Sequence, residues 1–198
     1  PSLALNSASF VCVFCANITS LSNHANGLHF ETGDPAGDGG GIKLDNSTIT
    51  ITGGSFVNNT AIDDGGAIVL WNNATLDASE CNIAGNSAQS GGGLWAGGSD
   101  YSEEQVVSLT NCTFQGNHAN DLNEHDFPIG DGGGIYAGYY NLNIIGGSFV
   151  GNTSVDQGGA MKLWNCPTLE AQTCTFSNNE STTGGAIHLY THGESESS

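Results

Sequence analysis

A long string of residues occurs twice in this chain with few changes. The copies are GSFVNNTAIDDGGAIVL at residues 54–70 and GSFVGNTSVDQGGAMKL at residues 147–163, 93 residues later. Each copy contains two shorter motifs, aromatic-x-x-Asn and Gly-Gly-small-aliphatic, that also recur elsewhere. Repetition of this kind is typical of arrays in which each unit buries its apolar face only against its neighbours. We therefore predict an elongated stack of short repeats.

The two motifs alternate strictly, and each occurs six times. The first places a large apolar residue three positions before an asparagine, at residues 14–17, 56–59, 83–86, 114–117, 149–152 and 176–179. The second is a glycine pair that begins at residues 39, 65, 91, 132, 158 and 184. After each pair apolar residues alternate with other residues, as at Ile42 and Leu44, which is strand periodicity. Each unit therefore predicts three short strands joined by Gly, Asn and Asp turns.

Three short strands per unit, stacked in parallel, describe an all-β parallel β-helix of about six coils. The motif asparagines are expected at an inward corner, bonded to the coils above and below and to local backbone. The glycine pairs are expected at another corner, where they permit positive φ or close backbone approach. We expect one domain at residues 1–190, built from duplicated three-coil blocks at about 1–100 and 101–190, and a flexible tail at 191–198.

The alternating FxxN and GGA(I/L) motifs resemble the repeats of the polymorphic outer membrane proteins. The passenger regions of that family belong to the right-handed parallel β-helices, a superfamily that also includes the pectate-lyase-like enzymes. The resemblance covers essentially residues 10–190. It implies a right-handed β-helix and is much less specific for function.

The charge of the chain excludes several classes of partner. Twenty acidic residues stand against Lys43, Lys162 and no arginine, for a net charge of −18. Such a surface repels phosphate backbones and anionic membrane faces, so we expect no nucleic-acid partner. No run of about 18 apolar residues is present, and we expect no direct membrane insertion. Cations and neutral glycans suit this surface better.

Cysteine parity and glycosylation sequons together predict a secreted, extracellular or cell-surface protein. The chain has six cysteines and seven Asn-x-Ser/Thr sequons. Sequons on outward or turn positions are expected to carry N-linked glycans, namely Asn17, Asn46, Asn58, Asn73 and Asn111. Asn152 and Asn179 belong to the inward ladder and are expected to be bare. Asn17 fits the inward motif locally, but the block alignment places it outward with Asn111, and we follow the alignment.

The spacing of the cysteines suggests three disulfides. Stacked positions in neighbouring coils are about 4.8 Å apart, within the Cα separation that a disulfide accepts, so Cys81 with Cys112 is the preferred pair. The four remaining cysteines would form two local disulfides, Cys12 with Cys15 and Cys166 with Cys174. The alternative joins Cys174 of one copy to Cys12 of the next, on the expectation that both share the position of Cys81. A redox or zinc function of the C-x-x-C at residues 12–15 is less favoured.

Acidic residues gather at two inserted corners, residues 24–38 and 118–131, and before the glycine pairs. Such groups suit a divalent cation, and calcium is the one cofactor considered. The candidate ligands are Asp38, Asp64, Asp131 and Asp156. Solvated loops and ordinary turn residues are the alternative explanation, since no established calcium-loop spacing is present.

Composition argues against an enzyme. Lyases and epimerases of this fold need a basic residue beside the substrate carboxylate, whereas this chain has no arginine and its lysines are expected at non-equivalent positions. No carboxylate pair lies on a predicted strand face, as an inverting hydrolase would need. We expect a glycosylated structural subunit that stacks head to tail with copies of itself into a fibre or surface appendage, because neither end shows a shielding segment. An adhesin-like or glycan-binding module is the alternative.

Overall fold

The computed structural model describes residues 3–6, 12–21, 23–25, 37–98, 105–120, 130–166 and 168–191. All regular structure within these ranges is β-strand, arranged in three parallel sheets. Sheet A contains, in spatial order, β1 (Leu3–Asn6), β4 (Ile42–Asp45), β7 (Ile68–Trp71), β10 (Leu94–Gly97), β14 (Ile135–Gly138), β18 (Met161–Trp164) and β21 (Ile187–Tyr190). Sheet B contains β2 (Cys12–Leu21), β5 (Thr48–Val57), β8 (Thr75–Ala84), β11 (Val106–Thr110), β12 (Thr113–Gln115), β15 (Asn141–Ile145), β16 (Ser148–Val150), β19 (Leu169–Gln172) and β20 (Thr175–Ser177). Sheet C contains β3 (His24–Ala25), β6 (Thr60–Ala61), β9 (Ser87–Ala88), β13 (His118–Ala119) and β17 (Thr153–Ser154).

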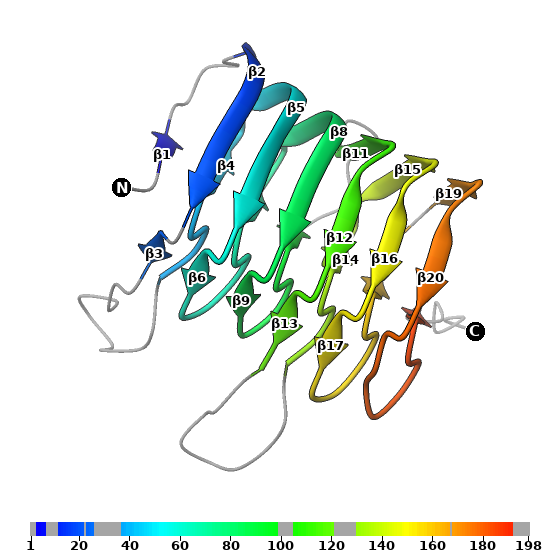
Figure 1. Ribbon diagram of the computed structural model, residues 1–198. Coiled ribbons are helices and arrows are strands. Elements are labelled where there is room, and N and C mark those ends of the chain that lie inside the picture. The colour runs from blue at the N-terminus through cyan, green and yellow to red at the C-terminus, as the bar shows by residue number, and fades with distance from the viewer. Residues whose placement is uncertain are drawn as a thin grey trace, which may run out of the picture.

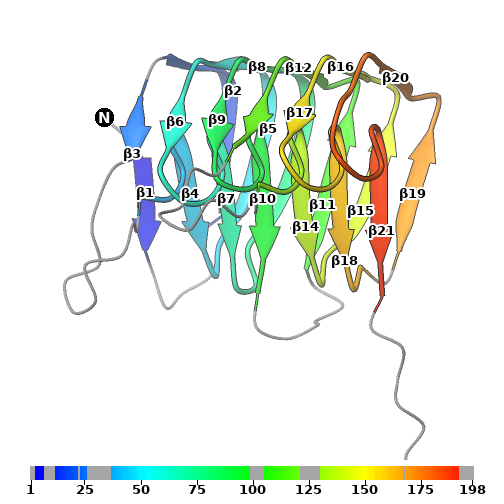
Figure 2. The same ribbon diagram turned by 90° about the horizontal axis from the view of Figure 1, so that it is seen from below.

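Strands pair with their equivalents one coil before and one coil after. In sheet A, β7 lies between β4 and β10, and Ile68 pairs with Ile42 and Leu94. Figures 1 and 2 show the sheets running along the rod, with β1 and β21 at opposite ends. The chain passes through sheets A, B and C in turn, so it forms a parallel β-solenoid. Its roughly six turns agree with the coils predicted from the motifs.

Inward side chains of successive coils lie on one another and fill the interior. The alternation of buried and half-buried residues along β4 and β5 follows the two-residue period of a strand. Phe114, Phe149 and Phe176 form one such ladder, with successive ring centroids 5.0 and 4.9 Å apart and nearly parallel rings. The core is therefore built from columns of side chains that run along the rod.

The motif asparagines form a buried column of amides, as predicted. Asn86 shows the pattern: its Nδ2 donates to Asn117 Oδ1 in the next coil and to the Phe56 carbonyl oxygen in the previous one, each at 2.9 Å. Its Oδ1 accepts from the backbone N–H and Nδ2 of Asn59, at 2.9 and 3.0 Å. All four hydrogen bonds that the amide can form are made, and Asn86 is fully buried.

In the first coil the ladder asparagine is Asn23, and the expectation that residues 14–17 fill this position is wrong. The N–H and Nδ2 of Asn23 donate to Asn59 Oδ1, at 3.1 and 2.9 Å. The place of the motif aromatic is taken by Ser20, which pairs with Phe56. Because Ser20 replaces the apolar residue of the motif, the true unit does not match the pattern. Residues 14–17 do match it, although they lie elsewhere in the coil.

The glycine pairs form another corner, and the two glycines serve different purposes. The first has a left-handed backbone, as at Gly65 with a φ of 62°. The second stands against the next coil: a Cβ on Gly92 would lie 2.4 Å from the carbonyl oxygen of His118 and 2.6 Å from that of Gly133. Both uses were predicted, and together they set the closest approach of neighbouring coils.

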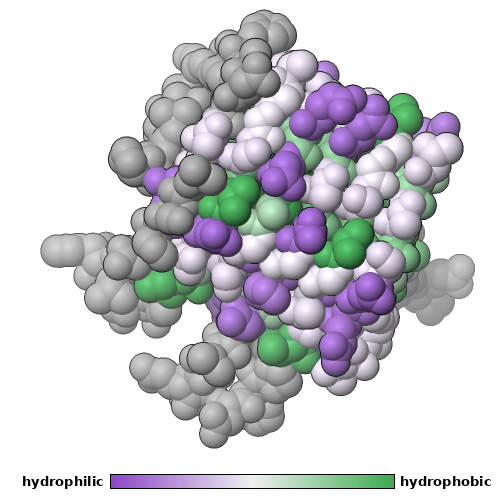
Figure 3. Space-filling model, viewed as in Figure 1, coloured by the Kyte–Doolittle hydropathy of each residue, from purple (hydrophilic) through white to green (hydrophobic). Residues whose placement is uncertain are grey.

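The side of the rod formed by sheet B is predominantly polar. Figure 3 shows hydrophilic and weakly polar residues on this face, with apolar residues scattered singly among them. Ile145 is one of the exposed apolar residues on this sheet. The described residues of this face therefore form no continuous apolar patch that would require a partner.

Candidate functional site

The outer face of sheet A carries both lysines of the chain in one column. The strand register aligns Lys43 with Val69, and continues through Trp95 and Tyr136 to Lys162. The expectation that the two lysines are non-equivalent is therefore wrong. It followed from the 93-residue offset, which aligns Lys162 with Val69 in the duplicated block, whereas the coils themselves repeat at a shorter spacing.

Aromatic rings stack on this face along the rod axis. The ring centroids of Trp71 and Trp95 are 5.1 Å apart, and those of Trp164 and Tyr190 are 4.6 Å apart. The Trp95 ring leans over Gly97, where an added Cβ would lie 2.3 Å from a ring carbon. These rings turn their faces toward one another, so stacking along the rod occupies the surfaces that would otherwise receive a flat ligand.

Two of the predicted metal ligands meet at one corner. Asp38, Asp63 and Asp64 offer oxygens that all lie within 4.8 Å of one another, and Lys43 Nζ lies 2.5 Å from Asp38 Oδ2. Burial, followed by the charges of Asp63 and Asp38, raises the pKa of Asp64 to about 8. The corner therefore has excess negative charge that a proton, a cation or Lys43 can offset. Calcium binding there stays a prediction.

The other two predicted ligands, Asp131 and Asp156, lie beside Lys162 instead. Asp131 Oδ1 accepts the backbone N–H of Gln157 at 3.2 Å, and Asp156 Oδ2 accepts from Gln157 Nε2 at 3.0 Å. Among the described residues they belong to no group of three metal-ligating side chains. The four aspartates thus divide between two corners and do not form one site.

Lys162 is the centre of a compact polar cluster that the sequence did not reveal. Its side chain is 1% exposed, and Nζ contacts Gln157 Oε1 and lies 2.7 Å from His188 Nδ1. The rings of Trp164 and Tyr190 cover the amine, each with its centroid 5.7 Å from Nζ. We call Lys162, Gln157, His188, Asp131 and Asp156 the Lys162 cluster. The available signal was the spacing of five residues that separates both Gln157 from Lys162 and Asp38 from Lys43.

Burial and neighbouring charge alter the acid–base behaviour of this cluster. Desolvation lowers the pKa of Lys162, and the nearby Asp131 and Asp156 carboxylates oppose this change. Burial raises the pKa of Asp131 to about 6, against the charge of Lys162. The pKa of His188 is lowered by burial and then by Lys162. The neutral forms of both the amine and the imidazole are therefore favoured relative to water.

The structure brings Cys81 and Cys112 together, as the preferred disulfide requires. They immediately precede Asn82 and Thr113, which pair across β8 and β12, so the cysteines stand in neighbouring coils. Both are free thiols, and a hydrogen bond between them raises the pKa of Cys81 and lowers that of Cys112. Formation of this bridge stays a prediction.

The other predicted cysteine pairs are separated. Cys166 and Cys174 lie at opposite ends of β19, whose four residues span about 13 Å. Cys12 and Cys15 both lie in the extended strand β2, where residues three apart are about 10 Å apart. The premise that Cys12 shares the position of Cys81 is wrong, because Cys12 pairs with Thr48 whereas Cys81 pairs with Gly54. The register therefore gives no basis for an intermolecular bridge between Cys12 and Cys174.

Exposure separates most of the described sequons as the corner assignment predicts, but Asn46 and Asn179 are both half-buried. The exposed ones are Asn58, Asn73 and Asn111. Asn46 is half-buried with a left-handed backbone, and the side chain of Asn17 lies outside the described residues. Asn152 is fully buried in the amide ladder, and Asn179 continues that ladder. Attachment of sugar to the outward sequons stays a prediction.

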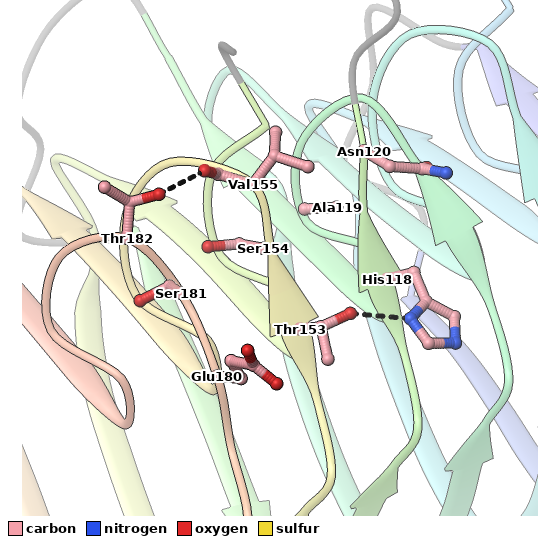
Figure 4. A pocket seen from close by; sticks show the side chains of 9 residues that line it. All are labelled: His118, Ala119, Asn120, Thr153, Ser154, Val155, Glu180, Ser181 and Thr182. Atoms are coloured by element: carbon pink, nitrogen blue, oxygen red, sulfur yellow. Dashed lines mark hydrogen bonds between the residues drawn. The ribbon is translucent and has the colours of Figure 1, made fainter.

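A polar cavity of about 540 Å³ opens beside the inserted corner at residues 118–131. Its lining comes from three neighbouring coils and consists of His118, Ala119, Asn120, Thr153, Ser154, Val155, Glu180, Ser181 and Thr182. Figure 4 shows His118 turned toward Thr153, with Nδ1 2.7 Å from Oγ1, and the Ser154 hydroxyl turned toward Ser181 and Thr182. Ser154 Oγ is buried and has no hydrogen-bond partner. The cavity is therefore lined by several polar side chains together with a few apolar ones. Most of the corner that borders it, residues 121–129, lies outside the described residues.

A parallel β-solenoid with an amide corner and a glycine corner is the class that these features define. The family model of the Chlamydia polymorphic membrane protein (Chlamydia_PMP) repeat matches residues 111–138 and 173–190. This match confirms the resemblance seen in the motifs, and the matched stretches cover less than half of the chain. Neither the curated proteins nor the solved structures contain a match. Within the described ranges there is no helix that could cross a membrane. The description of the family as membrane proteins agrees with a location at a cell surface.

Proposed function

We propose that this chain is a structural subunit of an extracellular rod at the cell surface, in which the β-helix of one copy continues into the next. One observation carries the proposal. In the interior coils the second position of each pair must be glycine, because the backbone of the next coil leaves no room for a Cβ. A Cβ on Gly66 would lie 2.2 Å from the Gly92 carbonyl oxygen, and one on Gly159 would lie 2.2 Å from that of Gly185.

Gly185 occupies this same position in the last described coil. A Cβ there would meet only the Asn179 carbonyl oxygen, at 3.3 Å, and the backbone is not left-handed. The described part of the chain therefore gives little reason for glycine at this position, whereas a further coil stacked upon it would. Glycine at this place supports a surface shaped to accept another coil.

Apolar exposure at the same end supports the proposal. Leu189 is 64% exposed, whereas its partner Leu163, one coil inward, is 1% exposed. A coil placed on β21 would bury Leu189 in the column to which Leu163 belongs, and burial of apolar surface contributes about 25 cal/mol per Å². We propose that the occupant is a second copy of this chain, because its own coils have the matching columns.

Sedimentation velocity over a concentration series tests this proposal. The wild type is expected to form chains whose mass grows with concentration, whereas Gly185→Ala and Leu189→Asp are expected to remain single copies. Ile145→Asp, an equally polar change on the side of the rod, is the control and should assemble like the wild type. A wild type that stays a single copy at every concentration, or a Gly185→Ala variant that assembles normally, contradicts the proposal.

An extracellular location, glycans on the exposed sequons and the absence of enzymatic activity complete this proposal. The exposed Asn58, Asn73 and Asn111 leave room for sugars on the sides of the rod. Net charge of −18 opposes nucleic-acid binding.

The polar cavity supports a second candidate function, a glycan-binding module. Its hydroxyl, amide, imidazole and carboxylate groups suit the hydroxyls of a neutral sugar. A glycan array is expected to show binding that Glu180→Gln weakens by roughly tenfold, the effect of about 1.4 kcal/mol. Asp77→Asn, on the exposed face of sheet B, is the control. Equal binding by both variants, or none by the wild type, excludes this function.

A further inference from the structure

The Lys162 cluster places a buried amine against the side-chain amide of the half-buried Gln157. Nζ of Lys162 contacts Gln157 Oε1, the lysine side chain is 1% exposed, and the Trp164 and Tyr190 rings cover it. Two reacting groups that are held together in this way need no collision, which removes much of the entropic barrier to their reaction.

We propose that Lys162 and Gln157 join in an intramolecular isopeptide bond that the folded protein forms by itself. The Nζ amine attacks Cδ of the Gln157 carboxamide, a bond forms between Nζ and Cδ, and the bond from Cδ to Nε2 breaks. The departing nitrogen leaves as ammonia after gaining the proton that Nζ loses. No oxidation, water or co-reactant is involved, and the product is a γ-glutamyl-lysine link between β18 and the turn before it.

Neighbouring side chains are placed to assist each step. His188 Nδ1 lies 2.7 Å from Nζ and can accept the amine proton during attack, as a general base. Asp156 Oδ2 accepts a hydrogen bond from Nε2 at 3.0 Å, at the atom that must depart. Asp131 holds the Gln157 backbone N–H at 3.2 Å and therefore acts as a positioning residue. Burial favours the neutral amine that the attack requires, since it lowers the pKa of Lys162.

The other lysine provides an internal control within the same column. The Lys43 side chain is 32% exposed, and its partner at 2.5 Å is the Asp38 carboxylate. A hydrated ammonium beside a carboxylate is an ion pair, and neither group is activated for amide formation. Lys43 is therefore expected to stay unlinked, although it stands five residues after its partner just as Lys162 does.

The denatured, reduced and deglycosylated chain reveals the bond by its mass. The wild type is expected to be lighter than its sequence mass by one ammonia molecule, and Lys43→Met should show the same loss. Lys162→Met should have its full sequence mass. His188→Phe, which keeps a ring of similar size, should accumulate the linked form more slowly. The folding of this variant is checked by circular dichroism, and its unlinked fraction is followed over time.

Trypsin gives an independent readout, because the chain has lysines only at 43 and 162 and no arginine. A linked chain is cut only after Lys43, which yields two fragments, the larger spanning residues 44–198 and lacking one ammonia. An unlinked chain yields three fragments, 1–43, 44–162 and 163–198. A wild type with full sequence mass and three fragments, after long incubation in the folded state, overturns the proposal. So does loss of ammonia that persists in Lys162→Met.

Discussion

Replacement of Asn117 by leucine is expected to lower the free energy of unfolding by about 3–5 kcal/mol, at about 1–3 kcal/mol for each buried group left without a partner. Asn117 Oδ1 accepts from the backbone N–H and Nδ2 of Asn86, at 3.0 and 2.9 Å. Asn117 Nδ2 donates to the Ile83 carbonyl oxygen at 3.0 Å. Leucine has a similar size but can satisfy none of these groups, and all of them lie out of reach of water.

Chemical denaturation of Asn117→Leu beside Asn82→Leu measures this effect. Asn82 lies in β8 with its side chain exposed, so the same substitution there removes no buried hydrogen bond. A change within about 0.5 kcal/mol is expected for this control. Equal unfolding midpoints for the two variants would mean that the amide column does not hold the coils together.

Substitution of Gly92 by alanine is expected to destabilise the rod by about 3 kcal/mol, the upper part of the usual range for overpacking. The added Cβ would lie 2.4 Å from one carbonyl oxygen and 2.6 Å from another, and both belong to backbone that cannot rotate away. Relief requires neighbouring coils to move apart. That movement would lengthen the hydrogen bonds between coils at this corner, such as that from Gly93 N to the Gly134 oxygen at 3.1 Å.

Gly185→Ala is the matched comparison for Gly92→Ala, because it makes the same change at the same position in the last described coil. Its Cβ has only one neighbour, at 3.3 Å, so the unfolding free energy of single copies is expected to change by about 0.5 kcal/mol. The two variants are compared by thermal or chemical unfolding at protein concentrations where the wild type does not assemble. Similar losses in both would show that local backbone effects, and not the stacking of coils, decide the need for glycine.

The fold was predictable because each coil repeats two residue types, asparagine and glycine, that few other residues can replace. A buried asparagine can satisfy both neighbouring coils and the backbone at once, and only glycine admits the approach seen at Gly92. Both residues therefore recur wherever the chain turns. The first coil was misjudged because Ser20 replaces the aromatic, and a local motif at Phe14 then scored better than the true unit that ends at Asn23.

The chemistry on the outer face of sheet A was only partly predictable from local motifs. Coils contain insertions of different lengths, so a fixed offset of 93 residues does not reveal which residues share a column. Lys43 and Lys162 each stand four residues after the start of a glycine pair, and the strand register confirms that they are equivalent. Only the structure shows that the turn before β18 brings Gln157 over the lysine. Cys166 and Cys174 are likewise close in sequence, but the extended strand β19 lies between them and keeps them apart.

Cryo-electron microscopy of the protein over a concentration series tests the central claim, that one β-helix continues from copy to copy. Six coils at about 4.8 Å give each copy an axial length of about 29 Å. The account predicts unbranched rods many times that length, with the spacing of about 4.8 Å unbroken across every junction, and their loss in Gly185→Ala. Separate particles one copy long at every concentration, in the wild type as in Gly185→Ala, would contradict it.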